Sequence, residues 1–189
     1  ELHDAIEHCL RNDYAQVINI GCGEGYYAVG IAIRLPNAEV HAFDCNPRAL
    51  EQCREMARIN GASERVRTYG ACTPELLRCL RCGPKVLVLS DCEGAELTLL
   101  KPEHLTFPLV DMVIESHEIE GLQTWKTLVE RFGGTHDWTC LHTQPRQPDA
   151  YASLAGMTRG RQLIALSEGR ATEMDWLVFR ARVRQPARR

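Results

Sequence analysis

A glycine-rich turn between two apolar stretches is the feature that most constrains what this chain can fold into. The apolar stretch Val17–Ile20 leads into the run GCGEG at residues 21–25, and a second stretch, Glu39–Phe43, ends at Asp44. A strand that feeds a glycine turn, followed by a strand that ends in a carboxylate, is typical of doubly wound α/β domains that bind an adenosine-containing cofactor. The glycines let the backbone approach the ligand, and the carboxylate accepts hydrogen bonds from ribose hydroxyls.

The spacing of these glycines favours one class of cofactor. A dinucleotide site requires G-x-G-x-x-G, because a pyrophosphate lies on the N-terminus of the following helix. Here the spacing is G-x-G-x-G, Tyr26 occupies the position of the third glycine, and Glu24 would place a negative charge beside the pyrophosphate. S-adenosylmethionine carries no phosphate, so neither feature opposes it. We therefore predict an S-adenosylmethionine site and disfavour a nicotinamide dehydrogenase.

Strand and helix patterns alternate along the chain, which predicts parallel strands joined by right-handed crossovers. The run at residues 86–89 is apolar without alternation, as expected for a strand that is buried on both faces. Asn46-Pro47 and Thr73-Pro74 are each typical of a helix start. We predict a Rossmann-like, doubly wound, mostly parallel sheet with helices on both faces. The expected strands cover residues 17–20, 39–43, 65–69, 85–90, 109–115, 138–142 and 173–183.

Length and composition indicate one globular domain. We divide the 189 residues into an N-terminal helix at 2–14, a cofactor-binding half at 15–120 and a C-terminal half at 121–189. No apolar run is long enough to span a membrane. The net charge of −3 argues against general binding of nucleic acid. The first residue is Glu1 rather than methionine, so the sequence leaves open whether the native N-terminus is included. It also leaves open whether the chain forms a homodimer.

Cysteine usage predicts a reducing compartment. The chain contains nine cysteines, an odd number, and it is not a small loop-rich scaffold that needs disulfides, so we expect free thiols and a cytoplasmic protein. Four of them follow the first four strands, and we expect them on the cofactor rim, too far apart in a 3-2-1-4 strand order to share one zinc ion: Cys22, Cys45, Cys72 and Cys92. The pair Cys79-x-x-Cys82 is interpreted as incidental. Arg180, Arg182 and Arg184 are expected to form the solvated side of a last, edge strand.

Three segments resemble the FkbM family of class I S-adenosylmethionine-dependent methyltransferases. They are NIGCGEGYY at 19–27, AFDCNP at 42–47 and DCEGAEL at 91–97, and the last is similar to the D-x-E-G-x-E signature of that family. Glu115-Ser116-His117 also resembles the family pattern after strand five, and the likeness covers about residues 15–120. The resemblance implies a seven-stranded sheet with an antiparallel last strand, and methyl transfer to a hydroxyl oxygen of a small molecule or a glycan. Asp44 stands where the family often has glutamate.

The carboxyl ends of parallel strands hold the ligand in such a sheet, which indicates the cofactor-binding residues. We assign the glycines to the methionine and ribose parts of the cofactor, Asp44 to the ribose hydroxyls, and the residues after strand three to the adenine. The full set of predicted cofactor-binding residues is Gly21, Cys22, Gly23, Gly25, Tyr26, Asp44, Cys45, Ala71, Cys72, Asp91 and Glu93.

Catalysis would require positioning of the acceptor and removal of its proton. His117 is the predicted base, and Asp91 is predicted to orient the ammonium of the donor or the acceptor hydroxyl. Glu93 could cap the next helix, and Glu96 is expected to have a structural partner. Oxygen ligands from Asp91, Glu93 and Glu115 could hold Mg²⁺, but their spacing does not establish a metal site, and we predict none.

A second functional class stays open from the sequence alone. The short C-terminal half leaves little room for a substrate-binding insertion, which would also suit a methyltransferase-like domain that has lost catalysis and serves as a binding module. Replacement of His117 with alanine tests the enzyme hypothesis once a substrate is found, because unchanged turnover would exclude His117 as the base.

Overall fold

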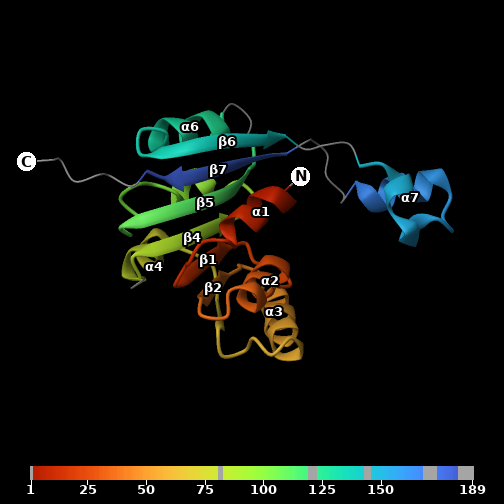
Figure 1. Cartoon of the computed structure of the whole chain (residues 1–189), viewed down its shortest axis with the longest axis horizontal. Helices are drawn as coiled ribbons and strands as arrows, with labels where there is room; N and C mark the ends of the chain where they lie inside the picture. The colour runs from red at the N-terminus through yellow and green to blue at the C-terminus, as the bar shows by residue number, and fades with distance from the viewer. Residues whose placement is uncertain (1, 81–82, 119–122, 143–145, 168–173, 183–189) are drawn as a thin grey trace, which may run out of the picture.

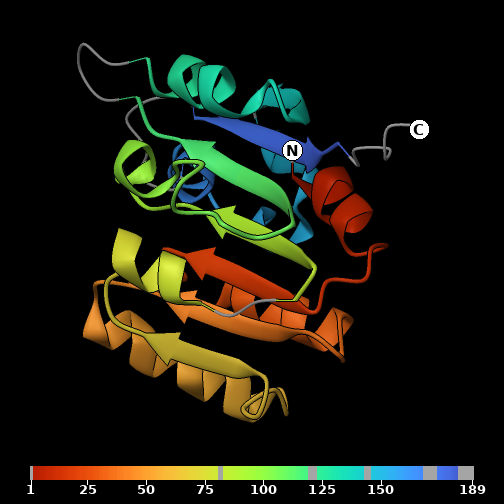
Figure 2. The same cartoon turned by 90° about the vertical axis from the view of Figure 1, so that its left-hand side faces the viewer.

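The computed structural model describes residues 2–80, 83–118, 123–142, 146–167 and 174–182. Its strands form one sheet in the order β3-β2-β1-β4-β5-β7-β6, and Figure 2 shows them side by side from β3 at the bottom of the view towards β7. β7 is antiparallel to both of its neighbours. The seven strands are β1 (Gln16–Ile20), β2 (Glu39–Phe43), β3 (Val66–Tyr69), β4 (Lys85–Ser90), β5 (Leu109–Ser116), β6 (His136–His142) and β7 (Asp175–Ala181).

Helices cover both faces of this sheet, as the sequence predicted. One face packs against α1 (His3–Cys9), α2 (Tyr26–Arg34) and α3 (Pro47–Ile59). The other face packs against α4 (Pro74–Cys79), α5 (Glu96–Leu99) and α6 (Thr124–Phe132). The predicted helix starts are confirmed, because the side chains of Asn46 and Thr73 accept hydrogen bonds from the backbone N–H groups of Arg48 and Leu76.

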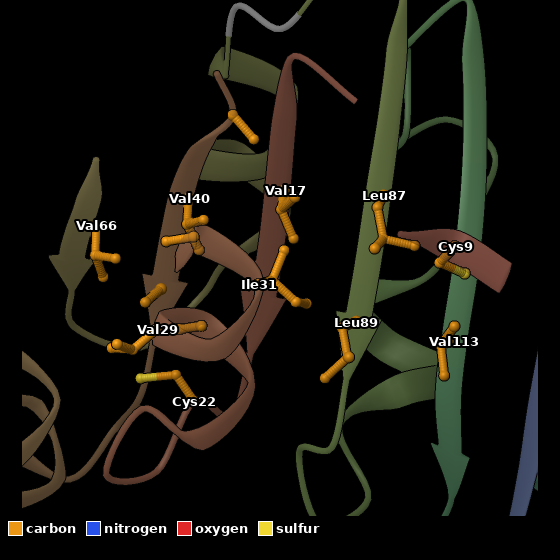
Figure 3. Packing of buried hydrophobic residues seen from close by; sticks show 14 of the residues in the cluster. Cys9, Val17, Cys22, Val29, Ile31, Val40, Val66, Leu87, Leu89 and Val113 are labelled. Atoms are coloured by element: carbon orange, nitrogen blue, oxygen red, sulfur yellow. The ribbon is translucent and has the colours of Figure 1, made fainter. Parts of the chain in front are cut away.

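Alternate residues of the central strands pack into two separate hydrophobic clusters. Val17, Leu87 and Val113 point towards the α1–α3 face, and Figure 3 shows Val17 level with Leu87, and Val113 level with Leu89 further along the strands. Ile18 and Val88, the next residues along β1 and β4, belong to the cluster on the opposite face. Because both faces of these strands are buried, their sequences are continuous apolar runs.

The C-terminal half departs most from the sequence-based expectations. β7 lies between β5 and β6, so the strand predicted at the sheet edge is internal. Arg182 is held by Asp137 of β6 at 2.8 Å, while Arg184 lies outside the described residues. The insertion of an antiparallel strand between two others cannot be recognised from an apolar pattern alone, because that pattern does not indicate which strands are neighbours.

A further segment lies between β6 and β7. It contains two 3₁₀ turns, η1 (Pro148–Ala150) and η2 (Ala152–Leu154), and the helix α7 (Arg159–Leu166). No residue of α7 is buried, and Figure 1 shows this helix standing apart from the sheet. Across the described residues, no helix is long and apolar enough to cross a membrane.

Candidate active site

The carboxyl ends of the central parallel strands enclose a hollow of about 350 Å³. It is lined by the glycine turn after β1 and by residues that follow β2, β3 and β4. Most of the predicted cofactor-binding residues lie here: Gly21, Gly23, Asp44, Cys45, Ala71, Cys72, Asp91 and Glu93. The sheet topology therefore brings together residues that are far apart in the sequence.

The glycine turn passes so close to the end of β4 that a side chain is excluded. Gly21 has a φ of +73°, and a Cβ atom added there would lie 1.7 Å from the carbonyl oxygen of Asp91. Gly25, with a φ of +97°, packs instead against Cys53 of α3. Gly25 does not line this hollow or the second hollow described below, so its predicted contact with the ligand stays a prediction.

Asp44 is held in place by backbone donors. Its Oδ2 accepts a hydrogen bond from the Gly23 N–H at 2.9 Å, and its Oδ1 accepts one from the Asn46 N–H at 2.8 Å. Each carboxylate oxygen has a second lone pair, so both can still accept a hydroxyl proton. The carboxylate is therefore oriented towards the hollow before any ligand binds.

A second, larger hollow of about 940 Å³ adjoins the first and shares Gly21, Gly23, Asp91 and Glu93 with it. Two predicted residues that are absent from the first hollow, Cys22 and Tyr26, line this one. The remaining lining residues come from the glycine turn, the end of β5 and the C-terminal half: Glu24, Tyr27, Glu115, His117, Arg146, Met174 and Trp176. The shared wall places Asp91 at the boundary between the two hollows.

His117, the predicted base, lies in the second hollow among carboxyl groups. Its Nδ1 forms a 2.7 Å hydrogen bond with Oε1 of the fully buried Glu96. Its Nε2 lies 3.5 Å from Oδ1 of Asp91 and 3.4 Å from Oε2 of Glu93. Glu115 contributes a further oxygen at 3.5 Å. Glu96 thus fixes the imidazole so that Nε2 faces the other acids.

These contacts change the acidity of both predicted catalytic groups. Burial disfavours the His117 cation, but the hydrogen bond that its ring donates to Glu96 and the surrounding negative charges outweigh burial and raise the pKa of His117. Burial, together with a hydrogen bond to Glu115 and its charge, raises the pKa of Asp91 to about 7. Perturbed groups of this kind in a cleft are characteristic of functional sites.

Glu96 is the residue whose part in the site the sequence analysis missed. A structural partner was expected, and that partner is the predicted base itself. The signal was present, because the D-x-E-G-x-E segment ends in Glu96, the first residue of α5. The expected cap from Glu93 is wrong: α5 has Ala95 at its N-cap, and no side chain bonds there. The Glu93 side chain is 85% exposed and approaches His117 instead.

The same cluster could accommodate a metal ion. Asp91, Glu93 and His117 each offer one ligand atom, and these atoms lie within 4.8 Å of one another. Glu115, which the sequence grouped with the two acids, lies beside His117. The expectation that the protein uses no metal stays a prediction.

The thiols around the two hollows fall into two groups. Cys45, Cys72 and Cys92 line the first hollow as expected, and burial raises the pKa of Cys72 and of Cys92 to about 12. Cys22 is buried against Cys53 of α3 and does not line that hollow. Cys79 is exposed at the end of α4, and Cys82 lies outside the described residues.

Known proteins resemble this chain in sequence over its first third and in structure over most of its length. Residues 11–69 match the sequence profile of a family described as a methyltransferase domain. A release factor glutamine methyltransferase from Deinococcus radiodurans is 40% identical over 60 residues, which are 32% of this chain and 22% of that protein. The chain therefore spans only about a fifth of the length of this curated relative.

Two solved structures show the shared architecture. Precorrin-6y C5,15-methyltransferase from Geobacter metallireducens aligns with a TM-score of 0.62 at 16% identity, covering 95% of this chain and 87% of the other. The O-methyltransferase TomG from Streptomyces achromogenes, solved with S-adenosylmethionine, aligns with a TM-score of 0.59 at 14% identity, covering 93% of this chain and 77% of TomG. The predicted Rossmann-like fold is therefore confirmed, and its seventh strand is antiparallel as expected.

Proposed function

We propose that this protein is an S-adenosylmethionine-dependent methyltransferase that methylates a hydroxyl oxygen of a small molecule or a glycan. The observation that carries the proposal is the junction of two hollows at Asp91, with an oriented imidazole on the far side. The first hollow suits the donor, and the second leaves space for an acceptor within reach of His117 Nε2.

The residues of the first hollow fit the proposed cofactor. Asp44 would accept hydrogen bonds from the ribose hydroxyls through oxygens that are already oriented. Ala71 and Cys72 would flank the adenine, and burial keeps the Cys72 thiol neutral. When bound, the cofactor supplies an electrophilic methyl group with its own leaving group.

The second hollow would provide the proton acceptor. His117 would hold the acceptor hydroxyl at Nε2 and take its proton, while Glu96 keeps the ring oriented and stabilises the imidazolium that forms. Asp91 would orient either the acceptor hydroxyl or the ammonium group of the donor. Oriented binding of this kind can contribute on the order of 7–11 kcal/mol to lowering a barrier.

The finer assignment to an FkbM-like enzyme rests on two of the segments that carried the resemblance. Asp91, Glu93 and Glu96 of the D-x-E-G-x-E segment all meet His117 of the Glu115-Ser116-His117 segment. A shared site gives a physical reason for both segments to occur in one chain.

Transfer of a labelled methyl group tests this proposal. The purified chain would be incubated with S-[methyl-³H]adenosylmethionine and panels of hydroxylated small molecules and glycans, and the label would be followed into product. We expect labelling of a hydroxyl oxygen that is lost in His117→Ala and kept in His3→Ala, an exposed histidine on α1. Labelling of a nitrogen would overturn the assignment to oxygen. Cofactor binding without turnover on any acceptor would favour the binding module instead.

A further inference from the structure

A thiol, an imidazole and a carboxylate come together on β6 and β7, outside the site described above. Cys140 and His142 are two residues apart on β6, so their side chains lie on the same face of the sheet. Asp175 of β7 lies directly opposite His142 in the antiparallel register, which places it on that face as well. One ligand atom from each of the three residues lies within 4.8 Å of the other two.

The distances within this group lie close to those of a metal coordination sphere. Nδ1 of His142 lies 2.9 Å from Oδ1 of Asp175 and 4.0 Å from Sγ of Cys140. Tetrahedral zinc has a bond of about 2.3 Å to sulfur and of about 2.0–2.2 Å to nitrogen or oxygen, so its ligand atoms lie roughly 3.3–3.6 Å apart. The observed distances bracket that range, and small side-chain rotations would bring the three atoms onto one ion.

The chemistry of the donor set selects among metals. Magnesium and calcium prefer oxygen ligands, whereas a set of sulfur, nitrogen and oxygen suits zinc. The His142 side chain is 70% exposed, so an ion can reach the group from solvent and keep a water molecule as its fourth ligand. We propose that Cys140, His142 and Asp175 form a zinc-binding site.

The position of the group in the fold indicates a structural role. β6 ends at His142 and β7 begins at Asp175, so the proposed ion would join the two ends of the segment that contains α7. α7 buries none of its own residues and stands apart from the sheet (Figure 1), so the core does not anchor it. Since His142 and Asp175 are already paired between β6 and β7, a zinc ion would add a metal cross-link between the two strands at the base of this segment.

Binding would displace a proton from the thiol. Burial and the neighbouring Asp175 raise the pKa of Cys140, so the metal-free thiol is protonated at neutral pH. Zinc is bound by the thiolate, so one proton passes to solvent for each Zn–S bond formed, and the affinity rises with pH. The alternative without metal is a simple ion pair between His142 and Asp175.

Titration with Co²⁺ after removal of metal by EDTA distinguishes the proposed zinc site from the metal-free pair of His142 and Asp175. A thiolate bound to Co²⁺ gives a near-ultraviolet charge-transfer band, which carboxylate and imidazole ligands alone do not give. We expect this band to saturate at one Co²⁺ per chain and to disappear when one equivalent of Zn²⁺ is added. Absence of the band in the wild-type protein would overturn the proposal.

Matched variants assign the band to these residues. Cys140→Ser and His142→Ala should abolish it in protein whose circular dichroism spectrum is unchanged, and Asp175→Asn should weaken Co²⁺ binding. Cys79→Ser, which removes an exposed thiol on α4, should keep it. Persistence of the band in Cys140→Ser would refute the site. Zn²⁺ should also raise the melting temperature of the wild type and leave that of Cys140→Ser unchanged. None of these readouts depends on methyl transfer.

Discussion

Carboxyl groups have opposite surroundings at the two ends of the parallel strands, which form two edges of the sheet. Near the edge where the parallel strands begin, Asp111 accepts hydrogen bonds from the Tyr14 hydroxyl at 2.6 Å and the Ala181 N–H at 2.8 Å, and Lys85 Nζ lies 3.2 Å away. At the edge where they end, four carboxyl groups gather around the imidazole of His117. A carboxylate that has its own donors and cation stabilises a fold, whereas crowded acids are suited to binding and proton transfer.

The largest expected effect is on turnover at the carboxyl edge. His117→Ala should lower kcat by about 10²–10⁴-fold, because the proposed proton acceptor is removed. The affinity for S-adenosylhomocysteine should stay within about twofold, since His117 lines only the second hollow. Steady-state kinetics and calorimetry on the same preparation measure both quantities. An unchanged kcat would show that His117 is not the base.

The matching change at the opposite edge should affect stability instead. Asp111→Ala leaves the Tyr14 hydroxyl and the Ala181 N–H without their acceptor, and it leaves Lys85 with Asn12 as a hydrogen-bond partner but without its carboxylate. We expect a loss of about 3 kcal/mol in the free energy of unfolding, measured by urea denaturation, with no change in cofactor affinity of the folded protein. A loss of binding in folded Asp111→Ala would contradict the division between the two edges.

The pH dependence of turnover sharpens the comparison. The raised pKa of His117 means that the ring is protonated, and unable to accept a proton, up to a pH above its ordinary 6.5. The rate should therefore rise with pH along an acid limb whose midpoint lies above 6.5. Glu96→Gln removes the charge that favours the imidazolium, so the midpoint should move to lower pH. A midpoint that stays in place in Glu96→Gln would exclude His117 as the titrating group.

The smallest expected effect is a gain in stability at the carboxyl edge. The pKa of Asp91 is raised from 3.8 to about 7, so the folded protein retains a proton that the unfolded chain has released. The free energy of unfolding therefore falls as pH rises through this range. Asp91→Asn cannot ionise and should be more stable than the wild type at pH above 7 by on the order of 1 kcal/mol, with lower turnover. Urea denaturation at two pH values measures this difference, and a less stable variant would contradict it.

The glycine turn could be predicted from the sequence because it depends on local signals, and the strand order β3-β2-β1-β4 followed from the doubly wound fold class that this turn indicates. An apolar run predicts a buried strand, and cap-plus-proline pairs predict helix starts. The insertion of β7 between β5 and β6 could not be predicted in this way, because strand pairing is a long-range choice. The link between Glu96 and His117 was missed for the same reason, since the two residues meet only when the ends of β4 and β5 are neighbours.

Isothermal titration calorimetry with S-adenosylhomocysteine tests the central claim most directly, because the account depends on the hollow at the glycine turn binding this class of cofactor. We expect micromolar affinity in the wild-type protein. Asp44→Ala should weaken it at least about tenfold through the lost hydrogen bonds to ribose, while Asp4→Ala, an exposed acid on α1, should bind as the wild type does. No binding heat from folded wild-type protein, or equal affinity in Asp44→Ala, would contradict the account.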